Sequence, residues 1–346
     1  MKILIINDYA NKFGGTEEFV YSLKNNLERR SHQVEILGSN SGQDFKSGFS
    51  RFYSSKWYKV TSDKIKSFSP DIVHIQNCSR ILSVSVINAS LDNNVPVIMT
   101  AHDVNLIYNY KPNFNLVNIL KYFKVIIHRK VINNSKILLI FPSEFLRNKF
   151  KLKFKNNLKI IHNGVDIPNK PTNYEKDILF VGRICKEKGL NVISKILNET
   201  STYNVKFLGE GPLKEKLSSE YKNIQFLGFQ KPDDYYKHAS ILILPSIVEE
   251  NQPLSILEAM SHGLCVIASN IGGIPEQIKH METGLLFEPG NEKDFKEKLD
   301  YLLKNPKEIK RMGKNAREFV KKNFNWDKTV KEYEKVYEEE IERFKR

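Results

Sequence analysis

The feature that most constrains this fold is a regular alternation of short apolar segments with helical patterns, repeated twice along 346 residues. Residues 16–30, for example, carry apolar side chains at helical spacing. The apolar segments are β-branched and nearly continuous, which is typical of parallel strands buried on both faces. We therefore predict an α/β fold in which strands and helices follow one another. The segments of the first half are 2–7, 33–38, 71–76, 95–100, 136–141 and 158–163.

A segment rich in Gly, Pro and Asn, residues 163–172, interrupts the alternation and is typical of a linker. A chain of this length exceeds one ordinary domain and fits two. The sequence predicts two doubly wound, Rossmann-like domains, 1–166 and 167–325, followed by an amphipathic helix over 326–346. The strands expected in the second domain are 177–182, 205–209, 224–228, 240–245, 264–269 and 284–287.

The bulk composition describes a globular protein with ample core, because 40% of the residues are hydrophobic and 27% are charged. Met1 leads directly into an apolar strand, and no apolar run reaches about 18 residues, so we expect neither a secretory leader nor a membrane span. Cys78, Cys185 and Cys265 lie far apart, which favours reduced thiols and a cytoplasmic location. The histidines are scattered, so no metal site is expected.

The net charge of +14 lies mostly in the first half, where residues 1–166 hold 24 Lys and Arg against 12 Asp and Glu. Such a field attracts phosphates, acidic lipid headgroups or nucleic acid. The basic first half contains no motif that recognises nucleic acid, so we expect no nucleic-acid partner.

Residues 114–131 combine apolar side chains with basic ones such as Lys121 and Lys124. This segment could lie peripherally on an anionic membrane that carries a lipid-linked acceptor. A core-packed helix with a solvated basic face explains the same pattern, and both interpretations stay open here.

Two features of the first domain follow strands directly. Gly14-Gly15 permits a tight turn and a close backbone approach by a ligand, although the pattern is not G-x-G-x-x-G and a plain turn explains it too. His102 follows the fourth strand, at the edge where doubly wound sheets bind ligands. It could donate a hydrogen bond to a substrate hydroxyl or phosphate, or serve as a structural hydrogen-bonding group.

In the second domain, Gly182 and Arg183 end the first strand, and Lys188 follows shortly after. A guanidinium grips phosphate through several donors and an ammonium adds a point charge, so this pair suits a diphosphate. The alternative is that both are solvated surface cations.

The segment 245–260 reads PSIVEENQPLSILEAM, with Glu250 and Glu258 eight residues apart. Pro253 suits the first turn of a helix, and the amides of that turn, around Leu254 and Ser255, form a site for an anion. Carboxylates accept hydrogen bonds from sugar hydroxyls. These residues could therefore hold a polyol and a phosphate together, although surface acids would give the same spacing.

The ordered set of motifs resembles the retaining glycosyltransferases of family 4, which belong to the glycosyl transferases of group 1 and have the GT-B fold. The resemblance covers nearly the whole chain. Its motifs are GG-T-E at 14–17, His102, N-G-V-D at 163–166, V-G-R…K-G at 181–189, the two glutamates of 250–258 with the following A-M, and GG-x-P-E at 272–276. It implies two Rossmann-like domains facing a central cleft, with the final helix crossing back to the first domain.

By this resemblance, Glu258 would bind the ribose of a nucleotide-sugar donor, and Arg183 and Lys188 would neutralise its diphosphate. Glu250 would lie near the sugar hydroxyls and the anomeric carbon, and His102 near the transferred sugar. The remaining expected donor-binding residues are Gly14, Gly15, Gly182, Leu254 and Ser255.

The implied enzyme is a hexosyltransferase that needs no metal or other cofactor and transfers a sugar with retention to a glycan or lipid-linked acceptor. The abundance of Lys, Asn and Ile is typical of an AT-rich bacterial genome, and hence of cell-surface polysaccharide or glycolipid synthesis. Three alternatives stay open: a double displacement with Glu250 as nucleophile, a nucleotide-sugar epimerase, and a non-catalytic lipid-binding module. Gln252 departs from the family, which commonly has an aromatic residue there.

Overall fold

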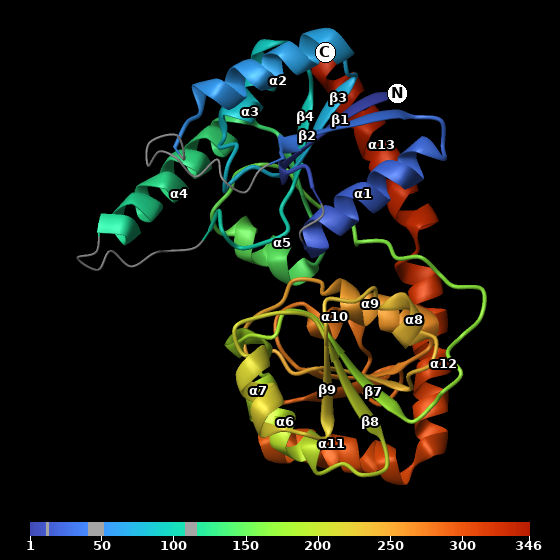
Figure 1. Ribbon diagram of the computed structural model, residues 1–346. Helices are drawn as coiled ribbons and strands as arrows, with labels where there is room; N and C mark the ends of the chain where they lie inside the picture. The colour runs from blue at the N-terminus through green and yellow to red at the C-terminus, as the bar shows by residue number, and fades with distance from the viewer. Residues whose placement is uncertain (12–13, 41–51, 108–115) are drawn as a thin grey trace. The chain divides into compact units, whose positions relative to one another are not determined.

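The computed structural model describes residues 1–11, 14–40, 52–107 and 116–346, with Leu116 and Val117 described in their backbone only. The chain divides into two compact units. Unit 1 is Met1–His162 together with Trp326–Arg346, and unit 2 is Asn163–Asn325. The elements of both are labelled in Figure 1.

Unit 1 is built on a six-stranded sheet in the order β2-β1-β3-β4-β5-β6, and every strand pair in it is parallel. Ile3, Leu4, Ile5 and Ile6 in β1 are fully buried, because helices cover both faces of the sheet. The strands are β1 Lys2–Tyr9, β2 Gln33–Ser39, β3 Ile72–Asn77, β4 Val97–Thr100, β5 Leu138–Phe141 and β6 Leu158–Ile160. The helices are α1 Gly15–Glu28, α2 Ser55–Phe68, α3 Ser85–Asp92, α4 Leu116–Ser135, α5 Glu144–Lys151 and α13 Trp326–Lys345.

Unit 2 repeats this architecture with a parallel sheet in the order β12-β11-β10-β7-β8-β9. The strands are β7 Asp177–Val181, β8 Asn204–Leu208, β9 Ile224–Gly228, β10 Ile241–Leu244, β11 Cys265–Ser269 and β12 Gly284–Phe287. The helices are the 3-10 turn η1 Lys186–Lys188, α6 Leu190–Asn198, α7 Lys214–Glu220, α8 Asp233–Tyr236, α9 Leu254–His262, α10 Ile274–Gln277, α11 Glu292–Lys304 and α12 Pro306–Asn323.

The predicted α/β fold is confirmed, and each of the twelve predicted apolar segments contributes a strand to one of the two sheets. Several strands are shorter than expected, β4 and β6 among them. β4 begins at Val97, just after Pro96, and β6 ends at Ile160. Proline has no amide hydrogen to donate to a neighbouring strand, which explains why β4 begins only after Pro96.

In each sheet the strand order reverses at one point, between β1 and β3 in unit 1 and between β7 and β10 in unit 2. Loops that leave neighbouring strands in opposite directions open a crevice at the carboxyl ends of those strands. The loops that follow β7 and β10 therefore define the place in unit 2 where a ligand is most readily bound.

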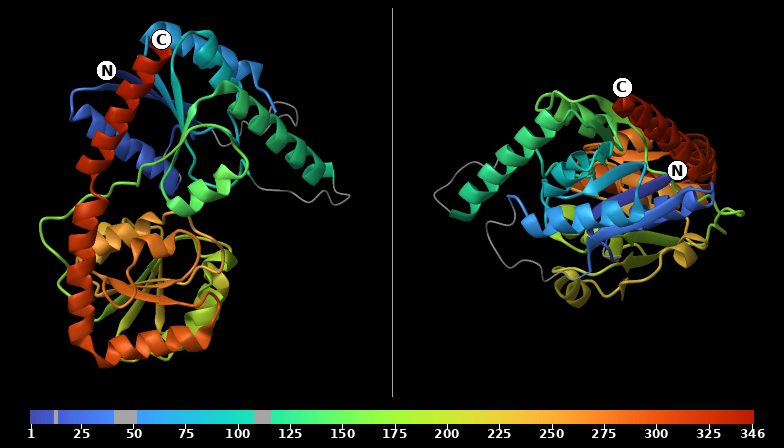
Figure 2. Two further views of the ribbon diagram at one scale, coloured as in Figure 1. Left: turned by 180° about the vertical axis from the view of Figure 1, so that it is seen from behind. Right: turned by 90° about the horizontal axis from the view of Figure 1, so that it is seen from above.

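The final helix, α13, packs on unit 1 beside α1 (Figures 1 and 2). Trp326 at its start stacks on Phe19 of α1 with ring centroids 5.4 Å apart. Tyr333 and Tyr337, further along α13, are fully buried. The apolar stripe of this helix is thus covered by unit 1.

Among the helices formed by described residues, none is both long enough and apolar enough to cross a membrane. Cys78, Cys185 and Cys265 are buried free thiols.

Candidate active site

An ion pair joins the loops that follow β7 and β10, at the point where the strand order of unit 2 reverses. Lys188 Nζ lies 2.5 Å from Glu250 Oε1, and Ser246 Oγ donates to the same oxygen at 2.7 Å. The two charged side chains are about one-fifth exposed, at 22% and 19%. Both contacts fall on Oε1, so the carboxylate is oriented while its other oxygen stays available to a ligand.

Two glycines lie against the backbone of the Glu250 loop. Gly189, at φ +68°, lies so close to Pro245 that an added Cβ would come within 2.0 Å of the Pro245 carbonyl oxygen. Gly272, at φ +62°, would place a Cβ 2.3 Å from the carbonyl oxygen of Glu250. A side chain at either position would displace the loop, which gives the K-G and GG-x-P-E patterns a physical reason.

Gln252 and the start of α9 are tied to the segment that enters unit 2. The Gln252 side chain is buried, and its Oε1 accepts a hydrogen bond from the Asn163 amide at 2.7 Å. Gln277 Nε2 donates to the Pro253 carbonyl at 3.2 Å. Pro253 is the N-cap of α9 and provides no side-chain acceptor, so the amides of the first turn are left to other partners. The residue that replaces the family's aromatic is therefore structural.

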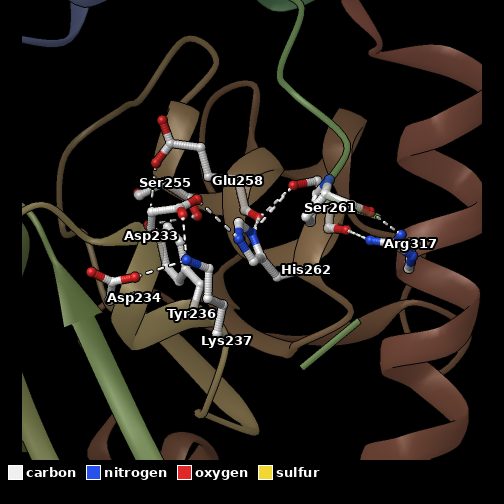
Figure 3. Close-up of polar contacts among 10 residues, drawn as sticks. Asp233, Asp234, Tyr236, Lys237, Ser255, Glu258, Ser261, His262 and Arg317 are labelled. Carbon is white, nitrogen blue, oxygen red and sulfur yellow. Dashed lines mark hydrogen bonds and ion pairs between the residues drawn. The ribbon is translucent and has the colours of Figure 1, made fainter. Parts of the chain in front are cut away.

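Glu258 projects from α9 toward Tyr236 of α8 (Figure 3). The Tyr236 hydroxyl donates to Glu258 Oε2 at 3.2 Å. Burial, together with the nearby Glu258 charge, raises the pKa of Tyr236 well above its usual value. Tyr236 therefore remains protonated and fixes the direction of one carboxylate oxygen.

The carboxyl end of α9 is held by a second set of contacts, also drawn in Figure 3. His262 Nδ1 donates to the Glu258 carbonyl oxygen at 2.9 Å. Arg317 of α12 is buried and donates to the carbonyl oxygens of Ser261 and Pro168. A charged donor on the last carbonyls of a helix is favourable because that end carries the negative pole of the helix dipole.

In unit 1, Gly14 is the N-cap of α1 and Gly15 is its first residue. A Cβ added to Gly15 would meet no atom of the described residues within 4 Å. Asn7 Nδ2 donates to Glu17 Oε1 at 3.2 Å and ties the first turn of α1 to β1. This geometry allows the close approach expected for the two glycines.

Asp8, at the end of β1, clamps the loop that follows β3. Its carboxylate accepts hydrogen bonds from the amides of Arg80, Ile81 and Leu82 at 2.8 to 2.9 Å. Burial raises the pKa of Asp8, while these three amides act in the opposite direction. Sequence reasoning did not single out this residue.

His102 lies after β4, where it was expected, and its ring meets that of Phe19 of α1 in a T-shaped arrangement with centroids 5.3 Å apart. Its Nε2 lies 2.7 Å from Gln76 Oε1. Burial lowers the pKa of His102 to about 4, so the imidazole is neutral at neutral pH and carries one proton.

Two family models match consecutive parts of the sequence. Residues 13–168 match the model described as Glycosyltransferase Family 4, and residues 166–319 match the one described as Glycosyl transferases group 1. The chain belongs to glycosyltransferase family 4. The resemblance found in the sequence is thereby confirmed.

Relatives of this glycosyltransferase agree with that assignment. An uncharacterised glycosyltransferase of Methanocaldococcus jannaschii is 28% identical, over 98% of both chains. A sucrose-phosphate synthase of Thermosynechococcus elongatus superposes with a TM-score of 0.80 at 18% identity, covering 98% of each chain. Anabaena HepE, solved in complex with UDP-glucose, gives 0.77 at 18% identity, covering 98% of this chain and all of the other. These likenesses confirm the GT-B fold.

The structure of this glycosyltransferase brings some of the predicted residues together and leaves others apart. Lys188 and Glu250 form one ion pair, and Glu258 stands further along α9 with Tyr236. Arg183 is exposed in the loop after Gly182, and among the described ion pairs it is Lys188 that reaches Glu250. No group of three or more His, Cys, Asp or Glu suited to a metal occurs in the described part of the chain.

Tyr236 and Arg317 were missed in the sequence. Both act through contacts between elements that are distant along the chain, and such pairs leave no local pattern. Ser246 could have been found, because it lies four residues before Glu250 in the loop already singled out.

Proposed function

We propose that this family 4 glycosyltransferase moves a hexose from a nucleoside-diphosphate sugar to an acceptor hydroxyl with retention of configuration. Unit 2 binds the donor and unit 1 binds the acceptor. The observation that carries the proposal is the oriented Glu250 carboxylate, held by Lys188 and Ser246 at the reversal point of the sheet in unit 2. This is where an open α/β sheet binds ligands.

The chemistry requires positive groups around the leaving diphosphate. Lys188 supplies an ammonium, Arg183 an exposed guanidinium, and the first turn of α9 supplies the amides of Leu254 and Ser255. Fixed donors of this kind stabilise charge that develops in the transition state, by about 3–4 kcal/mol for a single donor. With these groups on the diphosphate, the reaction proceeds without a metal ion.

Glu258 accepts hydrogen bonds from the ribose hydroxyls of the donor. Its carboxylate is partly buried and one oxygen is held by Tyr236, so the group is oriented before the ligand arrives. The structural likeness to HepE, which was solved with UDP-glucose, supports a nucleotide-sugar donor.

In the transfer step the bond from the anomeric carbon to the diphosphate oxygen breaks, and the acceptor oxygen bonds to the same face of the sugar. The leaving phosphate oxygen takes the proton of the acceptor hydroxyl. Glu250 stabilises the positive charge that develops on the sugar ring, and His102 and the start of α1 at Gly14-Gly15 contact the transferred sugar.

The acceptor is a glycan or a lipid-linked saccharide, and the protein works at the cytoplasmic face of an anionic membrane in bacterial cell-surface polysaccharide or glycolipid synthesis. The support comes from α4, part of which projects beyond the sheet of unit 1 (Figures 1 and 2). Among its described side chains, this helix exposes five large apolar ones, those of Leu120, Tyr122, Phe123, Ile126 and Ile127.

Basic residues accompany these apolar side chains, since Lys121 and Lys130 are also exposed. Lys124 is directed into unit 1, where it donates to the Ser79 carbonyl oxygen, so it is not part of the proposed membrane surface. The opposite face of α4 packs on the core of unit 1, because Val125 and Ile132 are buried there. Phe114, the first residue of the predicted segment, lies outside the described residues.

The experiment is a transfer assay with a panel of nucleoside-diphosphate hexoses and with glycan and lipid-linked acceptors, in the presence of a chelator. We expect release of nucleoside diphosphate and, by NMR, an α-linked product from an α-linked donor. Glu250→Gln should lower turnover by about 10²–10³-fold. Epimerisation of a donor without any acceptor, or full turnover by Glu250→Gln, would refute the proposal.

A further inference from the structure

The loop that follows β3, residues 78–84, lies where the strand order of unit 1 reverses, which is the place where an open α/β sheet binds ligands. Two other elements hold its backbone. The buried Asp8 carboxylate of β1 accepts hydrogen bonds from the three consecutive amides of residues 80–82, at 2.8 to 2.9 Å. Lys124 of α4 donates to the carbonyl oxygen of Ser79.

Two serines fix the same loop toward its ends. Ser79 donates to Asn77 Oδ1 through both its amide and its hydroxyl, each at 3.1 Å. Ser83 Oγ accepts a hydrogen bond from the Ser54 amide at 3.0 Å, which ties the loop to the start of α2. A ligand that binds to a loop held in this way costs little of the loop's conformational entropy.

Arg80 is the one exposed residue of loop 78–84, whose other residues are at most 8% exposed. Within the described part of the chain, its guanidinium forms neither a hydrogen bond nor an ion pair. A guanidinium presents five N–H donors in a planar fork that suits two oxygens of a phosphate or a carboxylate. The loop therefore holds the backbone of an arginine whose side chain can bind an anion.

The position of Arg80 in the sheet places it at the crevice of unit 1. The neighbouring strands β3 and β4 end at Asn77 and Thr100. Arg80 and Asp103 each follow three residues later, so both lie at the same edge of the sheet. Burial raises the pKa of Asp103, while the Asn105 amide and the charge of Arg80 act in the opposite direction. The charge of Arg80 is thus close to the carboxyl end of β4.

The two acids of this crevice have donors of their own. Asp103 accepts a hydrogen bond from the Asn105 amide at 2.8 Å. Asp8 is engaged by the three amides of the loop, and the charge of Lys124 also acts on it. The guanidinium of Arg80 is therefore able to bind a further anion.

The wider charge of unit 1 favours an anionic ligand. Residues 104–165, which include α4, β5, α5 and β6, contain twelve Lys and Arg against a single acid, Glu144. A field of one sign raises the local concentration of ligands of the opposite sign. Lys124, which contacts loop 78–84, belongs to this basic segment.

We propose that Arg80 binds a phosphate or carboxylate group of the acceptor, so that the acceptor of this glycosyltransferase is a negatively charged saccharide. This rests on the proposed function, in which unit 1 binds the acceptor, and it narrows the chemical class of that acceptor. Charge-assisted hydrogen bonds from the guanidinium hold two oxygens of the group. A neutral saccharide of the same size gains none of these contacts.

Three variants isolate the side chain from the loop. Arg80→Gln removes the charge and leaves the loop in place, because Asp8 binds the backbone amide of residue 80. Arg80→Lys keeps the charge without the planar fork and should restore part of the binding. Arg29→Gln, at an exposed arginine after α1, is the matched control. It lowers the charge of unit 1 by the same amount, so a general effect of charge would appear in both Gln variants.

The first experiment measures by NMR the binding of glucose, glucuronate and glucose 6-phosphate, which differ in the group at carbon 6, to the full-length protein. The donor site is saturated with the nucleoside diphosphate that calorimetry selects among ADP, GDP, TDP and UDP, so that the anions do not bind there. We expect one or both charged hexoses to bind about tenfold or more tightly than glucose. This preference should be lost in Arg80→Gln and kept in Arg29→Gln.

The identity of the preferred hexose shows whether the group is a phosphate or a carboxylate. Absence of any preference for a charged hexose in the wild type would overturn the proposal. An undiminished preference in Arg80→Gln would do the same.

The second experiment is steady-state kinetics with charged and neutral acceptors. For a charged acceptor, Arg80→Gln should raise the acceptor KM about tenfold or more, with kcat and the donor KM nearly unchanged. A general structural defect would lower kcat and raise the donor KM as well. If none of the four nucleoside diphosphates binds, the proposed function itself fails. Nucleoside diphosphate binding together with the same acceptor KM in wild type and Arg80→Gln would overturn the role of Arg80 alone.

Discussion

At the scale of single residues, Glu250 depends on contacts from three separate loops. Lys188 and Ser246 hold its carboxylate, and Gly272 lies against its backbone. Their effect is to orient one charged group before any ligand binds, which reduces the entropy lost on binding.

Lys188 offers a direct test of the charge at this site. We expect Lys188→Gln to lower transfer about 10²–10³-fold, because it removes the ammonium from both Glu250 and the leaving diphosphate. The measurement is steady-state kinetics with saturating acceptor. Lys186→Gln, two residues earlier and exposed, is the matched control and should retain activity. Similar losses in both variants would contradict the specific role of Lys188.

The buried histidines predict how stability depends on pH. Burial lowers the pKa to about 3 for His74 and to about 4 for His102, whereas both titrate near 6.5 in an unfolded chain. Below pH 6.5 the unfolded chain binds protons that the folded protein does not, so stability decreases as the pH falls. The loss is about 2 kcal/mol per histidine between pH 6.5 and pH 5.

Both tryptophans, Trp57 and Trp326, lie in unit 1, so denaturant unfolding followed by their fluorescence reports on this unit. We expect the pH dependence to become shallower in His74→Gln. His238→Gln, at a half-exposed residue of unit 2, should not change it. Equal slopes for the wild type and His74→Gln would contradict the burial of a neutral His74.

At the scale of elements, the alternation of apolar segments predicted all twelve strands of the described residues, because a strand buried on both faces is apolar along its whole length. The polar residues inside one such strand, β3, were not part of the site predicted from the sequence. His74 and Gln76 stand two apart in β3 and therefore point to the same face, opposite Val73 and Ile75. Polar side chains in a buried strand indicate partners on a covering element, here α13, which is distant along the chain.

The site residues also differ in how well the sequence predicts them. Lys188, Glu250 and the glycines lie in loops at strand ends, where position along the sequence predicts position in space. Tyr236 and Arg317 act between helices, and their partners depend on packing that no local pattern encodes. At Gly189 and Gly272 the glycine pattern has a physical basis, because a Cβ at either position would meet backbone atoms.

Gly272 tests the turn that supports Glu250. Gly272→Ala must place its Cβ against the Glu250 backbone and also adopt φ +62°, so we expect transfer to fall at least tenfold. Gly290→Ala is the matched control, because Gly290 has φ +76° and an added Cβ there meets nothing within 4 Å. Both variants lose about 1–2 kcal/mol of stability from the backbone conformation. Thermal denaturation measures this loss of stability, and kinetics measures the additional effect of displacing the Glu250 loop. Equal activities of the two variants would contradict the proposed role of Gly272 in supporting Glu250.

At the scale of the whole molecule, the proposed membrane surface is the exposed face of α4. Phe123 and Ile127 are 52% and 39% exposed, and aspartate at both positions should abolish binding to anionic vesicles without unfolding the protein. Flotation with vesicles of phosphatidylglycerol and phosphatidylcholine measures this. Leu152→Asp is the control, since this isolated residue after α5 is 83% exposed. Equal recovery of wild type and double variant with the vesicles would contradict the proposed surface.

The central claim is that unit 2 binds the nucleoside diphosphate part of a donor beside β7, β10 and α9. Titration calorimetry of the full-length protein with ADP, GDP, TDP and UDP tests it most directly. We expect one of these to bind with one site per chain, Glu258→Gln to weaken binding at least tenfold, and Glu215→Gln, exposed on α7, to have no effect. Absence of binding by all four, or equal affinity for the wild type and Glu258→Gln, would contradict the claim.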